Sequence, residues 1–182
     1  MTDSALHSHD SPAQWYTPPD IVEAAREVLG GIDLDPASHP EANVVVKAAR
    51  FFTAEDDGLA QVWTGSVFLN PPGGLVPEFW DELVRSGFVT DAIWIGYSLE
   101  QLQTLQGMGR VKTPLDYPMC IPKRRIPFVE NQAKQELMQK LRAAGKTPHP
   151  KSSPSHGNYI TYMGENPVLF ARVFRQFGQV RL

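Results

Sequence analysis

The chain alternates between short runs of apolar residues and segments in which apolar residues recur at helical spacing. The apolar runs predict strands at residues 32–35, 67–69, 92–95, 159–163 and 180–182. The helical spacing predicts helices at residues 18–29, 77–84, 99–105, 132–144 and 167–177. Residues 42–52 favour a strand at their three valines and a helix at their paired alanines, so both interpretations stay open. Strands that alternate with helices indicate an α/β sheet.

The first predicted helix has a distinct start. Thr17 is a good N-cap, Pro18 suits the first helical position, and Asp20 in the first turn favours the helix dipole. The same geometry would present backbone N–H groups and the Thr17 hydroxyl to a bound carboxylate, although capping alone also explains these residues. Residues 1–14 are polar and lack periodicity. We therefore expect them to be disordered and residues 15–182 to form a single domain.

The strand at 67–69 ends abruptly on Asn70, Pro71 and Pro72. Each proline fixes its own φ and pushes the preceding residue out of the helical region, so Asn70 should be extended. It would then lie at the carboxyl end of a buried strand, where open α/β sheets bind their ligands. The amide oxygen of Asn70 and the carbonyl of Pro71 would form a rigid pair of acceptors suited to a planar amino group. The alternative is a proline-rich turn with no function.

Composition narrows the class of protein. A chain of 182 residues with 42% apolar and 20% charged residues is typical of one soluble globular domain. No apolar run has the length of a membrane span, and the polar N-terminus lacks a signal-peptide core, so we expect a cytoplasmic protein. The single cysteine, Cys120, excludes an internal disulfide and a cysteine-rich zinc site. The five histidines lack ligand spacing, and we expect no metal.

Charge is distributed unevenly along the chain. Residues 1–100 carry 4 Lys or Arg and 16 Asp or Glu, a net charge of −12, whereas residues 101–182 carry 13 and 4, a net charge of +9. Such asymmetry indicates a polyanionic partner on the basic side, or two halves that neutralise each other across the fold. The candidate phosphate contacts are Lys123, Arg124, Arg125 and Lys151, with Arg110, Lys134, Lys140, Arg142 and Lys146. For each of them the alternative is a solvated surface charge.

Several motifs stand in one order. They are Trp-Tyr-Thr-Pro at 15–18, Asp-Leu-Asp-Pro-Ala-Ser at 33–38, Glu-Asp-Asp-Gly-Leu at 55–59, Trp63, and Phe-Leu-Asn-Pro-Pro at 68–72. In this order and spacing they resemble the phage-encoded DNA N6-adenine methyltransferases, the phage Dam-like family. The resemblance covers residues 15–98, and weaker similarity continues at 124–128 and 177–180.

The resemblance implies a Rossmann-like, S-adenosyl-L-methionine (AdoMet)-dependent methyltransferase fold, with a mixed, mostly parallel sheet and flanking helices. It implies methyl transfer to the N6 amino group of adenine in DNA, with the base flipped into the site. The catalytic residues would be Asn70, Pro71 and Pro72. Thr17 and Pro18 would lie near the methionine end of AdoMet, Asp35 and Pro36 beside its amino group, and Asp57 at its adenine; Trp15 belongs to the same set. Lys123, Arg124, Arg125 and Lys151 would bind DNA.

The chain departs from this family in two places. Many of these enzymes carry an aromatic residue after the second proline, where this chain has Gly73. Either another aromatic residue (Phe79, Trp80, Tyr97 or Phe128) takes its place, or the glycine leaves room for a bulkier amine. In addition, no glycine-rich loop follows residue 38, and we expect no separate target-recognition domain.

Two other functions stay open. The first is a non-catalytic DNA-binding or decoy protein on a degenerate methyltransferase fold, indicated by Gly73 and the missing glycine-rich loop. The second keeps the enzyme and changes the acceptor, because Asn-Pro-Pro also serves glutamine, cytosine-N4 and RNA guanine amines.

Overall fold

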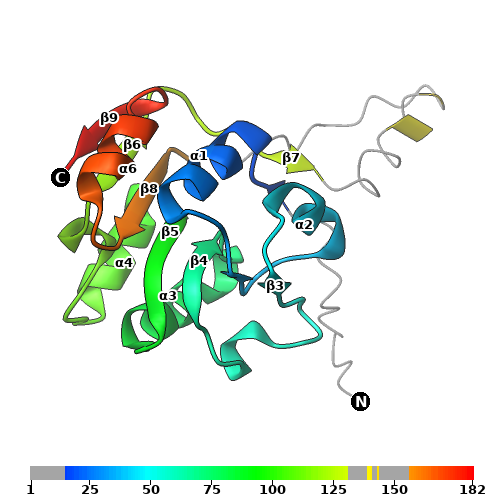
Figure 1. Cartoon of the computed structure of the whole chain (residues 1–182), viewed down its shortest axis with the longest axis horizontal. Coiled ribbons are helices and arrows are strands. Elements are labelled where there is room, and N and C mark those ends of the chain that lie inside the picture. Colours follow the sequence, from blue (N-terminus) through cyan, green and yellow to red (C-terminus); the bar gives the residue numbers. More distant parts are fainter. Residues whose placement is uncertain (1–14, 131–138, 141–142, 144–155) are drawn as a thin grey trace, which may run out of the picture.

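The centre of the fold is a mixed sheet of seven strands (Figure 1). The computed structural model describes residues 15–130, 139–140, 143 and 156–182. Across the sheet the strands follow the order β3 (Arg50–Phe51), β2 (Leu34–Asp35), β4 (Gly65–Leu69), β5 (Val89–Tyr97), β8 (Asn158–Met163), β6 (Met119–Pro122) and β9 (Gly178–Arg181). A separate antiparallel pair joins β1 (Trp15–Tyr16) to β7 (Val129–Glu130).

The two halves of the sheet differ in strand direction. The pairings from β3 to β5 are parallel, and those from β5 to β9 are antiparallel. The expected α/β class and mixed sheet are confirmed, but a mostly parallel sheet is wrong for the second half. The sequence could not show this, because a strand buried on both faces has the same apolar run whichever way it points.

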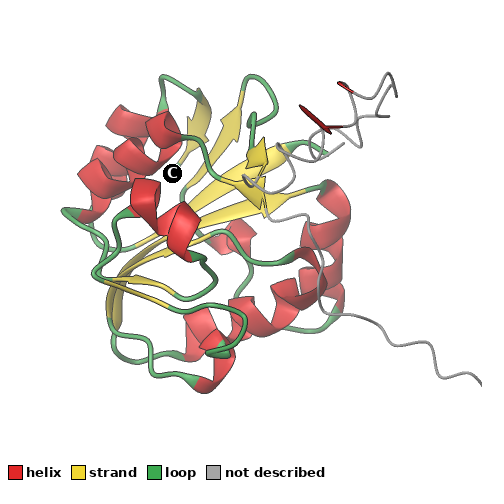
Figure 2. Cartoon of the chain, turned by 90° about the vertical axis from the view of Figure 1, so that its right-hand side faces the viewer, coloured by secondary structure: helices red, strands yellow, loops and turns green. Residues whose placement is uncertain are grey.

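Helices cover both faces of the sheet (Figure 2). One face is packed by α1 (Pro19–Leu29), α2 (Pro40–Val46) and α6 (Pro167–Phe174). The other is packed by α3 (Val76–Arg85) and α4 (Leu99–Gly107). Alternate residues of β4 and β5 point into the two cores, with Phe68 and Ile93 on the α1 side and Val67 and Trp94 on the α3 side. Because both strands are buried on both faces, only their ends are available to a ligand.

Helix α1 begins one residue later than the sequence predicts. Its N-cap is Pro18 and its first residue is Pro19, and no side chain caps it, so Thr17 is not the N-cap. The reason is the second proline: a residue that precedes proline is pushed out of the helical region, and Pro18 has φ −59° and ψ 149°. The Thr17 hydroxyl is thereby released from capping.

The sequence left both a helix and a strand possible at residues 42–52, and the structure has the end of a helix followed by a strand. The three valines end the helix α2, which is capped by His39 and has Pro40 in its first turn, and the chain then forms β3. A favourable start therefore outweighs the strand preference of the valines. The predicted helix at 132–144 and the expected disorder of 1–14 fall almost wholly outside the described residues. No helix of the described part combines the length and apolar character needed to cross a bilayer.

Candidate active site at the carboxyl ends of the parallel strands

The Asn70 side chain is held in one orientation. It follows the last residue of β4, is partly exposed, and donates a hydrogen bond from its amide nitrogen to the Trp15 carbonyl oxygen at 3.1 Å. A carbonyl can only accept, so the amide must turn its NH2 toward Trp15 and its oxygen away. Within the described residues, Asn70 Oδ1 accepts no hydrogen bond. This leaves an oriented acceptor at the end of the strand.

The two prolines keep the backbone beyond Asn70 extended. Pro71 is buried, and Pro72 is exposed with φ −64° and ψ 137°. The chain turns only after Pro72, whose carbonyl accepts the N–H of Leu75 at 3.0 Å within the short 3-10 helix η2 (Gly73–Leu75). The corner expected from the sequence is therefore present and partly open to solvent.

The Thr17 hydroxyl lies two residues from the carbonyl that orients Asn70. Thr17 is buried, and its Oγ1 has no hydrogen-bond partner among the described residues. A buried hydroxyl without a partner costs free energy, roughly 1–3 kcal/mol, unless a ligand satisfies it. By contrast, the start of α1 has fewer free backbone N–H groups for a carboxylate than expected. Pro19 has no N–H, and the Ile21 N–H donates to Asp20 Oδ1 at 2.9 Å.

Two aspartates, one just before β2 and one at its last position, have different environments. Asp33 accepts from the Ser66 N–H at 2.9 Å and the Ser66 hydroxyl at 3.1 Å, and so joins β2 to β4. Asp35 is buried and accepts the Ala37 N–H at 3.3 Å. Burial raises the pKa of Asp35 to about 6, against the opposing effect of its hydrogen bonds. Among the described residues it pairs with no Lys or Arg, so a buried carboxylate is available to a cationic ligand.

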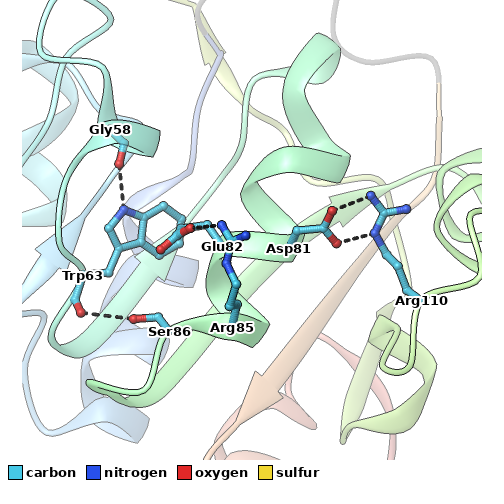
Figure 3. Close-up of polar contacts among 7 residues, drawn as sticks. All are labelled: Gly58, Trp63, Asp81, Glu82, Arg85, Ser86 and Arg110. Atoms are coloured by element: carbon cyan, nitrogen blue, oxygen red, sulfur yellow. Dashed lines mark hydrogen bonds and ion pairs between the residues drawn. The ribbon is translucent and has the colours of Figure 1, made fainter.

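The turn that carries Asp57 packs against the segment after Asp35. Asp57 is exposed with a φ of +50°, and Gly58 begins the 3-10 helix η1 (Gly58–Ala60). A Cβ on Gly58 would overlap the Pro36 carbonyl oxygen, so only glycine allows this approach. From below, the buried Trp63 donates its indole N–H to the Gly58 carbonyl at 2.7 Å (Figure 3). The structure thus brings the Asp35-Pro36 and Asp57 segments together.

The basic tripeptide Lys123, Arg124 and Arg125 is exposed between β6 and β7. It is anchored at both ends, since the Lys123 N–H donates to the Phe177 carbonyl at 2.8 Å and the Ile126 N–H to Asn158 Oδ1 at 3.1 Å. The Asn158 amide nitrogen also donates to the Gly96 carbonyl at 3.4 Å, near the end of β5. The chain then reaches β7, whose partner β1 holds Asn70. These contacts place the tripeptide at the same edge of the sheet as Asn70, where β4, β5 and β6 end.

The other predicted phosphate contacts are in an ion pair, exposed, or outside the described residues. Arg110 is wrong as a phosphate contact, because it forms a two-point ion pair with Asp81 of α3 and only 11% of its side chain is exposed (Figure 3). Lys151, Lys134, Arg142 and Lys146 lie outside the described residues, whereas Lys140 is exposed. Among the described residues, no group of three or more His, Cys, Asp or Glu could hold a metal ion.

Sequence reasoning missed two residues that support the site. Asn158 links the basic segment to β5, and Gln101 of α4 holds the end of β5 by accepting the Tyr97 N–H at 3.1 Å. Neither residue belongs to a motif, and both act across more than one element. A single sequence carries no signal for such contacts.

Comparison with protein families identifies one match. The model of the family described as DNA N-6-adenine-methyltransferase (Dam) matches residues 4–144. The match includes Thr17, Asp35, Asp57, Asn70 and the basic tripeptide. Searches of curated proteins and of solved structures found no match.

Proposed function

We propose that this chain, which belongs to the DNA N-6-adenine-methyltransferase (Dam) family, transfers a methyl group from AdoMet to the exocyclic N6 of an adenine in DNA. The observation that carries the proposal is the orientation of the Asn70 amide. Its nitrogen donates to the Trp15 carbonyl, and its oxygen accepts no hydrogen bond from any residue that the structure describes, which leaves an acceptor at the end of β4. This acceptor meets the requirement of an amine that must be held before it reacts.

The proposed chemistry uses two acceptors. Asn70 Oδ1 and the Pro71 carbonyl would accept the two N–H hydrogens of the adenine amine, and Pro72 would keep both acceptors fixed. The nitrogen lone pair, withdrawn from conjugation with the ring, is then directed at the electrophilic carbon. The nitrogen would take the methyl carbon as the bond from that carbon to the sulfonium sulfur breaks and a neutral thioether leaves; the nitrogen, now cationic, would then lose one proton to solvent. Catalysis is thus mainly positioning and electrostatic stabilisation by groups that are already oriented.

The residues around Asn70 fit AdoMet, whose sulfonium supplies the electrophilic methyl group. Asp35 would pair with its ammonium, which would relieve the cost of a buried, uncompensated carboxylate. Thr17 Oγ1 would gain the hydrogen-bond partner that no described residue supplies, beside Pro18 and Trp15. Asp57, exposed on the turn against Pro36, would accept from the adenine amino group of the cofactor.

The proposed fold is Rossmann-like. Its supporting feature is the parallel half of the sheet, in which β2, β4 and β5 end side by side with helices on both faces. Ligands of such sheets bind at the carboxyl ends of the strands. An adenine inside a duplex cannot reach this edge, so the target base would be flipped out, and Lys123, Arg124 and Arg125 would contact the phosphates, together with Lys151.

The test is methyl transfer to DNA from cells that lack adenine methylation, with labelled AdoMet and analysis of the released nucleosides. We expect N6-methyladenine with the wild type. Asn70→Ala should lower kcat by roughly 10²–10³-fold, the effect of removing one oriented catalytic hydrogen-bond group. Because Asn70 is partly exposed, the melting temperature of the Asn70→Ala variant should differ little from that of the wild type.

Asn166→Ala is the matched control. Asn166 caps α6 by accepting the Leu169 N–H at 3.0 Å, so its loss should cost about 1 kcal/mol of stability and leave kcat unchanged. AdoMet binding without methylation of any DNA would contradict the proposal. Absence of AdoMet binding would favour a non-catalytic DNA-binding protein, and a methylated cytosine would favour a different amine acceptor.

A further inference from the structure

Tyr97 approaches the backbone directly after Asn-Pro-Pro. It is the last residue of β5, the parallel neighbour of β4, so the two strands end at the same edge of the sheet. A Cβ added to Gly73 would lie 2.5 Å from the Tyr97 hydroxyl oxygen and 3.5 Å from its Cζ. The phenol therefore occupies the space into which a side chain at position 73 would grow.

Contacts on both sides of the residue fix the Tyr97 backbone. Its N–H donates to Gln101 Oε1 at 3.1 Å, and the same oxygen accepts the buried Tyr159 hydroxyl at 2.5 Å. Ser98 has a φ of +61°, donates its N–H to the Gly157 carbonyl at 2.8 Å, and caps α4 through its hydroxyl. A non-glycine residue at positive φ is strained and persists only where its surroundings hold it. The backbone that carries the Tyr97 ring is thus held by contacts on both sides of the residue.

The other aromatic residues near this edge are committed to the core. Phe79 and Trp80 are buried residues of α3, and the Trp80 indole N–H donates to the Lys112 carbonyl at 2.9 Å. Phe128 packs on the opposite face of the sheet, against the core under α1 and α6. Tyr97 also packs against the core under α3 and α4, but part of it is exposed, and its ring centroid lies 6.4 Å from that of His156.

We propose that Tyr97 supplies the aromatic face against which the target base lies when its amine is held by Asn70, and that Gly73 is small in order to admit the Tyr97 hydroxyl group. This inference rests on the proposed function and adds a base-contacting residue to it. A base taken out of a helix loses its stacking, and enzymes replace that loss with an aromatic side chain. Such a contact is sequence-tolerant, because every base has a π-face.

The test compares Tyr97→Leu with Tyr97→Phe in the methylation assay. Tyr97→Leu removes the ring and should lower kcat/KM for DNA about 10- to 100-fold, with AdoMet affinity unchanged. Tyr97→Phe keeps the ring and should stay within about threefold of the wild type. The matched control is Tyr117→Leu, which removes a partly buried tyrosine that packs on Trp80, and should leave kcat/KM unchanged even if it lowers the melting temperature.

Gly73→Ala provides an independent arm. Its Cβ would overlap the Tyr97 hydroxyl oxygen and push the phenol aside, so we expect a loss of kcat/KM similar to that of Tyr97→Leu, and no further loss in the double variant Gly73→Ala/Tyr97→Leu. Full activity of a folded Tyr97→Leu, or additive losses in the double variant, would overturn the assignment of Tyr97 while wild-type activity upholds the proposed function. An inactive wild type would reject the proposed function itself.

Discussion

Two aspartates that are two residues apart, one just before β2 and one at its last position, show how local surroundings decide the chemistry of a side chain. Asp33 is satisfied by Ser66 and joins two strands. Asp35 is buried without a cationic partner among the described residues, and its pKa is raised to about 6. Asp33 is thus a structural residue, and Asp35 is the one that a cationic ligand would stabilise.

The raised pKa of Asp35 predicts a pH dependence of stability. The unfolded chain releases this proton near pH 4, whereas the native chain holds it to about pH 6, so between these values the native state binds more protons. The free energy of unfolding should therefore fall as pH rises through this window, by about 2–3 kcal/mol in total, and then level off. Asp35→Asn should lack this contribution. Urea unfolding of both proteins at pH 4.5 and pH 7.5 measures it, and equal pH dependence would contradict the assignment.

The same group predicts the pH dependence of cofactor binding. If the Asp35 carboxylate pairs with the AdoMet ammonium, protonation competes with binding, and the Kd should rise about tenfold between pH 7 and pH 5. Calorimetric titration of the wild type and Asp35→Asn tests this expectation. The variant should bind weakly at both pH values, and a Kd of the wild type that does not change with pH would exclude the ion pair.

At the scale of elements, the site depends on close contacts between segments rather than on any one helix or strand. The turn of η1 reaches Pro36 only because residue 58 has no side chain, and Trp63 holds that turn from the core side. The position of Asp57 therefore depends on the close approach of the adjacent Gly58 to Pro36.

Gly58→Ala should consequently disturb both stability and binding. The added methyl group overlaps the Pro36 carbonyl, and we expect a loss of about 1–3 kcal/mol in the free energy of unfolding, together with weaker AdoMet binding. Gly87→Ala is the control, because a Cβ at Gly87 meets nothing within 4 Å and should leave both quantities unchanged. Thermal unfolding and titration of the two variants separate these outcomes, and an unaffected Gly58→Ala would show that η1 does not need this contact.

Sequence reasoning located the strand ends well and the contacts between them poorly. The apolar run before Asn70 and the two prolines after it are local, so the corner could be predicted from short-range sterics. Helix α1 starts one residue later than predicted, because Pro19 keeps the preceding residue, Pro18, out of the helical region. The bond from Asn70 to Trp15 joins residues 55 positions apart, and the pairing of β1 with β7 spans more than a hundred. Neither leaves a periodic signal.

At the scale of the whole molecule, the basic half of the chain contributes the exposed tripeptide Lys123, Arg124 and Arg125 to the edge of the sheet that carries the candidate site. Both ends of that segment are hydrogen-bonded, one to β8 and the other just after α6, so its charges stand at fixed positions. Fixed charges favour phosphate contacts over a diffuse field.

The double variant Arg124→Gln/Arg125→Gln should therefore weaken binding to DNA of any sequence. The slope of log K against log salt concentration should become shallower by about 2, since each arginine that binds a phosphate accounts for about 1. Arg172→Gln/Arg175→Gln removes the same charge from exposed positions on and just after α6, and should leave the slope unchanged. Fluorescence anisotropy over a range of salt concentrations measures both, and equal slopes for the two variants would indicate only a general charge effect.

The bond between Asn70 and Trp15 also has a consequence during synthesis on the ribosome. Trp15 lies in β1, which is held by β7, and β7 is made about sixty residues after Asn70. The nascent chain can thus complete β4 and both prolines while the amide is still free to rotate. We expect the first strand to pair with β7 after residue 130 has left the exit tunnel, and the Asn70 amide therefore to be oriented late in synthesis.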